Sequence, residues 1–165
     1  MIYEFLETHQ IPYLRVDHPA VYTCEEARQH VPRLPGAETK NLFLCDDKGK
    51  KHFLVAVGYE KSVDLKLLAG TLACTGLRLA SPARLMKYLK LEPGSVTLLG
   101  VLHDANFDVQ VIIDADLWKN DALLCHPLVN TSTLVLARAD LLKFFRLTGH
   151  SPQIITIPTR VQFHD

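Results

Sequence analysis

Apolar and polar positions along this chain group into short runs, which predict several brief strands with helices between them. Residues 41–46 (NLFLCD) and 51–58 (KHFLVAVG) are two such runs, joined by the polar turn Asp47-Lys48-Gly49-Lys50. Apolar runs of this length between turn residues are typical of buried strands, and the short connection indicates a hairpin. Further strands are expected at 107–114, 122–125, 132–137 and 153–158, with an early strand ending at His18-Pro19.

Helices are indicated by apolar spacings of three and four residues and by capping signals. Residues 2–9 have that spacing, and residues 23–26 (TCEE) form a capping box that would open a helix running to about His30. Asp64 and Ser81-Pro82 stand at the start of two more helices, where a capping side chain and a first-turn proline are favoured. Residues 139–149 (ADLLKFFRLTG) are amphipathic, and Gly149 is placed to end that helix.

The organisation of these elements favours one domain. No repeat, low-complexity tract or linker interrupts the 165 residues, a length that fits a single domain spanning 1–165. Because strands outnumber helices, we expect a mixed α/β (α+β) fold, in which helices surround a central, partly antiparallel mixed sheet. The G-x-G-x-x-G and P-loop signatures of nucleotide-binding folds are absent from the sequence.

Composition narrows the class of protein further. Hydrophobic residues make up 48% and charged residues 22%, and no apolar run approaches the roughly 20 residues that span a bilayer. The N-terminal MIYEFLETHQ is acidic and lacks the layout of a secretory signal, so a cytoplasmic protein without a membrane partner is expected. The four cysteines are scattered, and two of them sit inside apolar runs, as reduced core cysteines do. Because Cys and His are not clustered, no metal site is expected, and no cofactor is expected either.

Charge is balanced overall but uneven along the chain. The net charge is zero, which argues against a generic nucleic-acid binder. Nine Lys and Arg residues nevertheless fall between 48 and 90, and five aspartates fall between 104 and 121. This split is compatible with one face that meets phosphates, and equally with ordinary solvated surface charge.

Two stretches carry candidate chemistry. In "GAETKNLFLC" (36–45), Lys40 opens a buried run, either as a solvated strand-edge lysine or with its ammonium aimed into a pocket. In "CHPLVNTSTL" (125–134), His126 follows one strand and polar residues crowd before the next. Buried polar groups need partners, so Asn130 and Thr131 either satisfy a turn or face a site, and the same alternatives hold for His126.

Other candidates are weaker. Asp114 and Asp116 resemble a paired-carboxylate site, although such a pair at a strand end is more often a solvated turn. His18, His103 and His150 lie in loop-like sequence with no partner that the sequence identifies. No G-x-S-x-G elbow is present, and Cys24 lacks the electropositive setting that activates a thiol, so nucleophilic catalysis is not supported.

The segments LPGAETKNLFLCDDKGKKHFLVAV, VDLKLLAG, ASPARL, PGSVT and HPLVNTSTLVLARADLLKFFRLTGH together resemble one family. Their order and spacing are similar to those of the free-standing relatives of the bacterial prolyl-tRNA synthetase editing domain, the YbaK/ProX superfamily. The resemblance is strongest to the PrdX (ProXp-ala) branch and runs from about residue 15 to 155. It implies a mixed α/β domain that hydrolyses mischarged tRNA in trans, with Ala-tRNA(Pro) as substrate.

The resemblance also implies roles for individual residues. The essential lysine of the family falls on Lys40, expected to bind the tRNA acceptor end, and its histidine falls on His126, expected to line the aminoacyl pocket. The substrate-cradling G-x-x-x-P loop begins at Gly94, but Leu98 replaces its proline, and His103-Asp104 replaces the usual Asn-Asp. The remaining substrate-binding positions implied are Thr39, Asn41, Ser95, Val96, Thr97, Leu98, Pro127, Asn130 and Thr131.

The absence of a nucleophile is compatible with this activity. The aminoacyl ester is already activated, so a protein that positions it and supplies backbone donors can act without one. The need for such an activity also follows. A synthetase pocket built for proline cannot strongly exclude the smaller alanine, because a missing methylene is worth only about 1–3 kcal/mol, so a second, smaller site must remove the alanine.

Two other functions remain open. One is a non-catalytic module that binds tRNA or prolyl-tRNA synthetase, or that regulates transcription; it predicts a pocket blocked by Leu98. The other is an enzyme that acts on a small free amino acid or its derivative.

Overall fold

A computed structural model describes residues 1–20, 25, 29 and 33–161. The capping box and helix expected at 23–30 lie largely outside these described residues. The helices are α1 (Ile2–Thr8), α3 (Leu65–Thr71), α4 (Pro82–Leu89), η1 (Leu98–His103), α5 (Ala115–Trp118) and α6 (Arg138–Thr148). The strands are β1 (Leu14–Asp17), β2 (Thr39–Asp46), β3 (His52–Gly58), β4 (Leu77–Leu79), β5 (Val109–Asp114), β6 (Ala122–Cys125), β7 (Ser132–Ala137) and β8 (Gln153–Ile155).

A five-stranded mixed sheet with the order β4-β2-β3-β5-β8 forms the centre of the fold. β2 and β3 are the predicted hairpin, with Lys40 opposite Val57 and Cys45 opposite His52. β5 runs parallel to both β3 and β8, whereas β4 is antiparallel to β2. All but the last residue of β3 are buried, which explains why its sequence is nearly continuously apolar.

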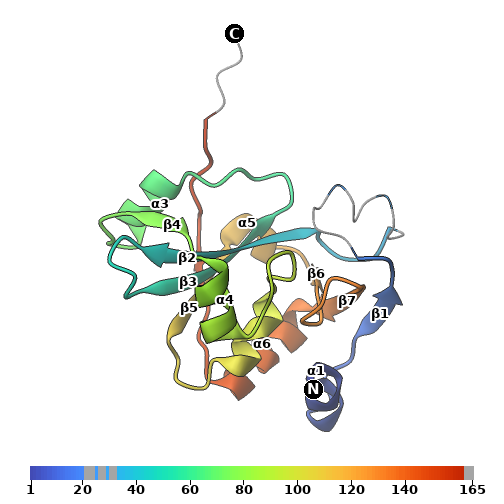
Figure 1. Cartoon of the computed structure of the whole chain (residues 1–165). Coiled ribbons are helices and arrows are strands. Elements are labelled where there is room, and N and C mark those ends of the chain that lie inside the picture. Colours follow the sequence, from blue (N-terminus) through green and yellow to red (C-terminus); the bar gives the residue numbers. More distant parts are fainter. Residues whose placement is uncertain (21–24, 26–28, 30–32, 162–165) are drawn as a thin grey trace.

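A second, three-stranded antiparallel sheet has the order β1-β7-β6. It meets the first sheet where Ala37 forms a parallel bridge with Leu123, just before β2 begins. Figure 1 shows β2 extending from the three-stranded sheet to β4 on the opposite side of the molecule. The bridge therefore brings the start of β2, with Lys40, beside the end of β6, where His126 follows.

The two faces of the five-stranded sheet support two hydrophobic cores. On one face, side chains of β2, β3 and β5 such as Phe43 and Leu54 pack with apolar residues of α1, α4 and α6, among them Leu89 and Phe144. On the other face, the intervening side chains pack against α3 and the segment after β8. This alternation along each strand is the period-two pattern of a sheet covered on both sides.

The predicted helix boundaries are confirmed where the structure describes them. The Asp64 side chain accepts a hydrogen bond from the Leu67 amide at 3.0 Å, and the Ser81 side chain accepts one from Arg84 at 3.2 Å. Gly149 ends α6 with a φ of 82°, a conformation that costs glycine little.

The strand expected at 107–114 was wrong at its first residues. Phe107 is 62% exposed and has a φ of 58°, so it lies in a turn. The Asp104 carboxylate accepts hydrogen bonds from the amides of Asp108 and Val109, at 3.0 and 2.9 Å, and this turn delays the strand to Val109. Similarly, the last strand stops at Ile155 rather than 158.

Candidate functional site

An open cleft of about 1870 Å³ lies beside the first half of β2. Its walls come from β2, the turn after β3, α5, the turn at Gly94 and the β6–β7 region. The cleft brings together six residues that the sequence places in the site: Thr39, Lys40, Asn41, Gly94, Val96 and His126. Lys40 and His126 therefore line one cleft, although they lie 86 positions apart in the sequence.

Lys40 is half-buried in the wall of this cleft. Its ammonium donates a hydrogen bond to the backbone carbonyl of Lys61, in the turn after β3. The neighbouring Thr39 hydroxyl donates to the carbonyl of Leu124 at 2.6 Å, which ties β2 to β6. Lys40 is thus held in the cleft wall and is not a freely solvated strand-edge residue.

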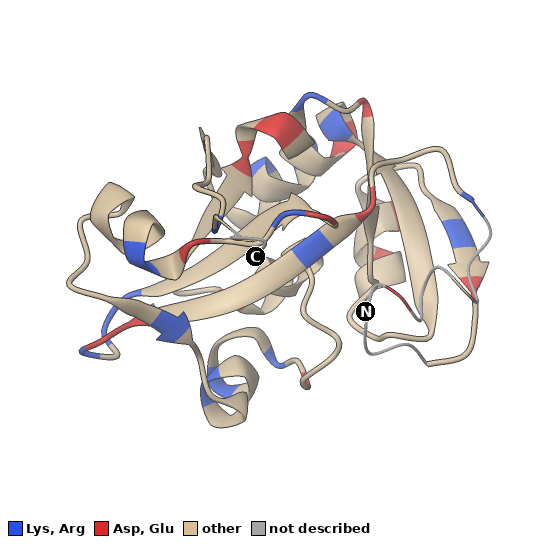
Figure 2. Ribbon diagram, turned by 90° about the horizontal axis from the view of Figure 1, so that it is seen from above, with Lys and Arg blue, Asp and Glu red and all other residues tan. Residues whose placement is uncertain are grey.

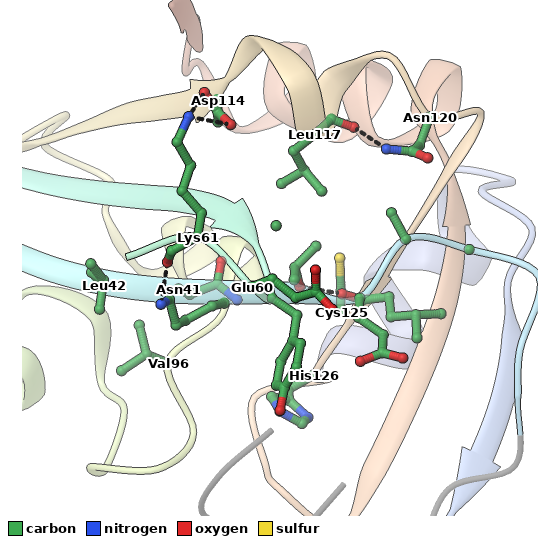
Figure 3. Close-up of a pocket in the computed structure, with 18 of the residues that line it drawn as sticks. Asn41, Leu42, Glu60, Lys61, Val96, Asp114, Leu117, Asn120, Cys125 and His126 are labelled. Carbon is green, nitrogen blue, oxygen red and sulfur yellow. Dashed lines mark hydrogen bonds and ion pairs between the residues drawn. The ribbon is translucent and has the colours of Figure 1, made fainter. Parts of the chain in front are cut away.

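Asn41 presents a polar atom that the fold leaves without a partner. Among the described residues, only Asn41 Oδ1 and the Tyr3 hydroxyl are buried side-chain polar atoms lacking a hydrogen bond. Asn41 lines the cleft together with Glu60 and Lys61, and Figure 3 labels all three. Buried acceptors are rarely left unpaired, so Asn41 Oδ1 is suited to receive a donor from a bound ligand.

His126 lies in the cleft as a neutral ring with a defined tautomer. Its Nδ1 is 3.2 Å from the Ser132 carbonyl oxygen, which can only accept, so Nδ1 carries the proton. Burial lowers the pKa of His126; the hydrogen bond to Ser132 partly offsets this shift, and the nearby His18 adds to it. Near neutral pH, Nε2 therefore keeps a free lone pair with which it can accept a hydrogen bond.

His18 supports the same wall of the cleft. Its Nδ1 is 2.9 Å from the Pro19 carbonyl and its Nε2 is 2.8 Å from the hydroxyl of Thr133, a cleft residue. The sequence identified no partner for His18, because Thr133 lies on the distant strand β7. The other two loop histidines are also paired: His103 with the Leu89 carbonyl at 2.9 Å and His150 with Asp104 at 2.9 Å.

The loop that begins at Gly94 contributes only part of its length to the cleft. Gly94 has a φ of 87°, which favours glycine, and Val96 also lines the cleft. Ser95 and Thr97 are buried outside the lining, and Thr97 caps η1 through the Leu99 amide. Leu98 is 1% exposed in the hydrophobic core, so its side chain does not block the cleft.

Three residues after His126 also lie outside the lining of the cleft. Pro127 and Asn130 are buried, and Thr131 is exposed, with its carbonyl accepting a hydrogen bond from the His18 amide at 2.9 Å. Leu128 between them has a φ of 69°. These residues belong to the turn between β6 and β7 that follows His126.

The structure also adds Lys61, which the sequence did not select, and gives Asp114 a different partner from the one considered. Lys61 contributes both its carbonyl, to Lys40, and its ammonium, which binds the Asp114 carboxylate at 3.0 Å (Figure 3). Asp114 and Asp116 do not form a carboxylate pair, because Asp114 is buried against Lys61 while Asp116 binds Lys119 at the surface. The parallel pairing of β3 with β5 creates the Lys61–Asp114 contact, which no local pattern indicates.

Within the part of the chain that the structure describes, no group of three or more His, Cys, Asp or Glu residues could hold a metal ion. No helix in that part is long and apolar enough to cross a membrane.

Comparisons with known proteins show which family the chain is similar to. The family model of the aminoacyl-tRNA editing domain matches residues 18–144. The prolyl-tRNA editing protein ProX of Acetoanaerobium sticklandii is 37% identical over 152 residues, 92% of this chain and 93% of that protein. The prolyl-tRNA synthetase associated domain-containing protein 1 of Danio rerio is 37% identical over 155 residues, 93% of this chain and 84% of its own length.

A similar fold occurs among solved structures. A candidate trans-editing enzyme for prolyl-tRNA synthetase superposes with a TM-score of 0.67, covering 93% of this chain and 92% of that chain at 22% identity. At this identity the likeness shows a shared fold only. The family is shown by the two sequence relatives, which are 37% identical over most of both chains. The chain belongs to the aminoacyl-tRNA editing domain family, the YbaK/ProX-like group to which its sequence motifs point.

Proposed function

We propose that this chain is a trans-editing aminoacyl-tRNA deacylase that hydrolyses Ala-tRNA(Pro) to alanine and free tRNA. The observation that carries the proposal is that Lys40, His126 and the Gly94 turn line one cleft. Membership in the editing family supports the reaction class, and the name of the ProX relative supports tRNA(Pro) as the nucleic acid. Mischarging by prolyl-tRNA synthetase would supply the substrate, in the cytoplasm.

Positioning accounts for the chemistry, since the described residues of the cleft offer no activated thiol. Burial raises the pKa of the Cys125 thiol to about 12, so this cleft residue stays protonated and is a poor nucleophile. Water adds to the ester carbonyl, the ester C–O bond breaks, and the ribose oxygen leaves with a proton. Lys40 holds a phosphate of the terminal nucleotide as a point charge, which orients the ester for this attack.

Asn41 and His126 would recognise the aminoacyl end. Both offer acceptors in the cleft, Asn41 through its unpaired Oδ1 and His126 through Nε2, and an aminoacyl ester carries an ammonium that needs acceptors. A neutral His126 also avoids repulsion of that ammonium. Val96 and the bulk of the imidazole would restrict the space for the side chain, which favours alanine over proline.

The test is a deacylation panel with Ala-tRNA(Pro), Cys-tRNA(Pro), Ser-tRNA and Pro-tRNA(Pro). We expect the fastest release from Ala-tRNA(Pro). Faster release from another mischarged tRNA would show that this tRNA, and not Ala-tRNA(Pro), is the preferred substrate. No turnover of any mischarged tRNA would refute the proposed deacylase activity.

A basic surface on the hairpin tip offers contacts for the rest of the tRNA. The hairpin-tip surface comprises the exposed residues Lys48, Lys50, Lys51, Arg78 and Lys87. Figure 2 shows Lys and Arg positions, coloured blue on the ribbon, along the β2–β3 turn, β4 and α4. At about 3.3 Å per residue, the turn lies roughly 23 Å along β2 from Lys40, so it could meet the acceptor stem while the terminal ester occupies the cleft.

Reversing charge on the hairpin-tip surface should weaken tRNA binding without affecting the chemistry. For Lys48→Glu/Lys50→Glu/Lys51→Glu, loss of up to three phosphate contacts should reduce the slope of log Kd against log salt by about two to three. Hydrolysis of a short aminoacyl-CCA fragment should be unchanged, because the fragment does not reach the tip. Filter binding across a salt series and fragment assays would check both results; an unchanged salt slope would show that tRNA does not contact the tip.

The pH dependence of the reaction should reflect the lowered pKa of His126. The ordinary pKa of a histidine is 6.5, and the lowered pKa keeps the His126 ring neutral at that pH. After the spontaneous rate is subtracted, kcat/KM should therefore stay level as the pH falls through 6.5 and should decline only at lower pH. The decline follows from the repulsion of a protonated ring on the substrate ammonium. His126→Asn should remove this acidic decline. A decline centred above pH 6.5 that depends on His126 would contradict the neutral-ring role.

A further inference from the structure

The position of the Lys40 ammonium depends on a backbone group. Its hydrogen-bond acceptor is the carbonyl oxygen of Lys61, in the turn that follows β3. The Lys61 amide in turn donates to the Gly58 carbonyl at 3.0 Å, and Tyr59 donates to Glu38 at 3.1 Å, so this turn folds back on the start of β2. Any movement of the turn would therefore change where the Lys40 ammonium points.

The side chain of Lys61 anchors this turn to the centre of the fold. Its ammonium lies 3.0 Å from both carboxylate oxygens of Asp114, with side-chain exposures of only 14% and 2%. Asp114 ends β5, and its Oδ1 also accepts a hydrogen bond from the Ile157 amide at 2.9 Å. The pair thus links the turn after β3 to β5 and to the segment after β8.

Burial makes this ion pair difficult to separate. A charge left alone in a desolvated site is strongly unfavourable, whereas an exposed pair can open at little cost. The chain also contains an exposed pair of the same type, between Asp116 on α5 and Lys119 directly after it, at 3.3 Å and with 72% and 77% of the side chains exposed. Only the buried pair is suited to hold a neighbouring residue in place.

We propose that Lys61 and Asp114 are positioning residues for Lys40, an inference that rests on the proposed deacylase function. The pair fixes the turn so that the Lys61 carbonyl directs the Lys40 ammonium into the cleft. It also neutralises the Asp114 carboxylate, which lines the same cleft and would otherwise attract Lys40. The ammonium of Lys40 thereby stays available for the substrate phosphate.

Removing Lys61 and then Asp114 tests this arrangement. Lys61→Met leaves the carboxylate unbalanced, so Lys40 should turn toward it and kcat/KM for Ala-tRNA(Pro) should fall by about tenfold or more. Lys61→Met/Asp114→Asn removes that attraction but not the loss of the anchor, so it should recover only part of the rate. Lys61→Arg keeps the ion pair and should keep the wild-type rate. Lys119→Met is the matched control and should behave as wild type.

A second readout follows Lys40 without any need for activity. Acetylation of each lysine by a mild acylating reagent, followed by mass spectrometry, should be several-fold slower at Lys40 in Lys61→Met and should recover in part in the double variant. If wild type proves inactive, the deacylase proposal fails, while this readout still decides the positioning of Lys40. Unchanged Lys40 reactivity in Lys61→Met, or equal loss of rate in the single and double variants, would overturn the inference.

Discussion

Lys40→Ala should abolish deacylation while leaving the fold intact. Loss of a donor that holds a reacting group in place costs about a hundredfold or more in rate, and the ammonium of Lys40 is the proposed anchor for the terminal phosphate. The ammonium donates to a single backbone carbonyl, Lys61, and the side chain is only half-buried. We therefore expect single-turnover rates close to the uncatalysed rate, with thermal unfolding within a few degrees of wild type.

The control for this experiment is Lys119→Ala, which removes a lysine of the same charge that is 77% exposed. It should leave the rate unchanged, since Lys119 does not line the cleft. Lys40→Arg would separate the need for charge from the need for a compact ammonium. A Lys40→Ala variant that deacylates as fast as wild type would rule out the role assigned to this lysine.

Asp104→Ala should cause the largest loss of stability among the polar substitutions considered. The buried carboxylate accepts from the amides of Asp108 and Val109 and lies 2.9 Å from Nε2 of His150, each of the two side chains being 3% exposed. Truncation leaves these groups without their partner in a desolvated site. Each buried donor left unsatisfied costs about 1–3 kcal/mol, so we expect a total loss of several kcal/mol.

Urea denaturation would measure this loss as a lower midpoint with an unchanged slope. Asp116→Ala is the appropriate control, because Asp116 binds Lys119 at the surface, where a pair contributes about 0–1 kcal/mol. A loss for Asp104→Ala no larger than that of Asp116→Ala would mean that Asp104 does not hold the turn before β5 in place.

Local patterns predicted much of the fold. The β2–β3 hairpin follows from two apolar runs around a polar turn, and the caps at Asp64 and Ser81 follow from side chains that can accept amide protons. The division into two sheets was not predictable in this way. β1 pairs with β7, with Asp17 opposite Ser132, and such distant pairing leaves no local signal.

The candidate site was predictable to a similar extent. The sequence motifs that carry the family resemblance identified Lys40, Asn41, Gly94 and His126, and all four residues line the cleft. Leu98 shows the limit, because its place in the loop motif suggested a cleft residue, whereas its apolar side chain is buried in the core.

Lys61 and Asp114 show the converse limit. They are separated by 53 positions and meet only because β3 and β5 run side by side. Contacts that depend on strand order require the fold, whereas caps and hairpins require only neighbouring residues.

The most direct test of the central claim compares two tRNAs that differ only in the attached amino acid. Release of amino acid from Ala-tRNA(Pro) and from Pro-tRNA(Pro) should be followed with the wild-type chain and without protein. The account predicts rapid release of alanine and no release of proline above the spontaneous rate. Spontaneous rates for both tRNAs would contradict it.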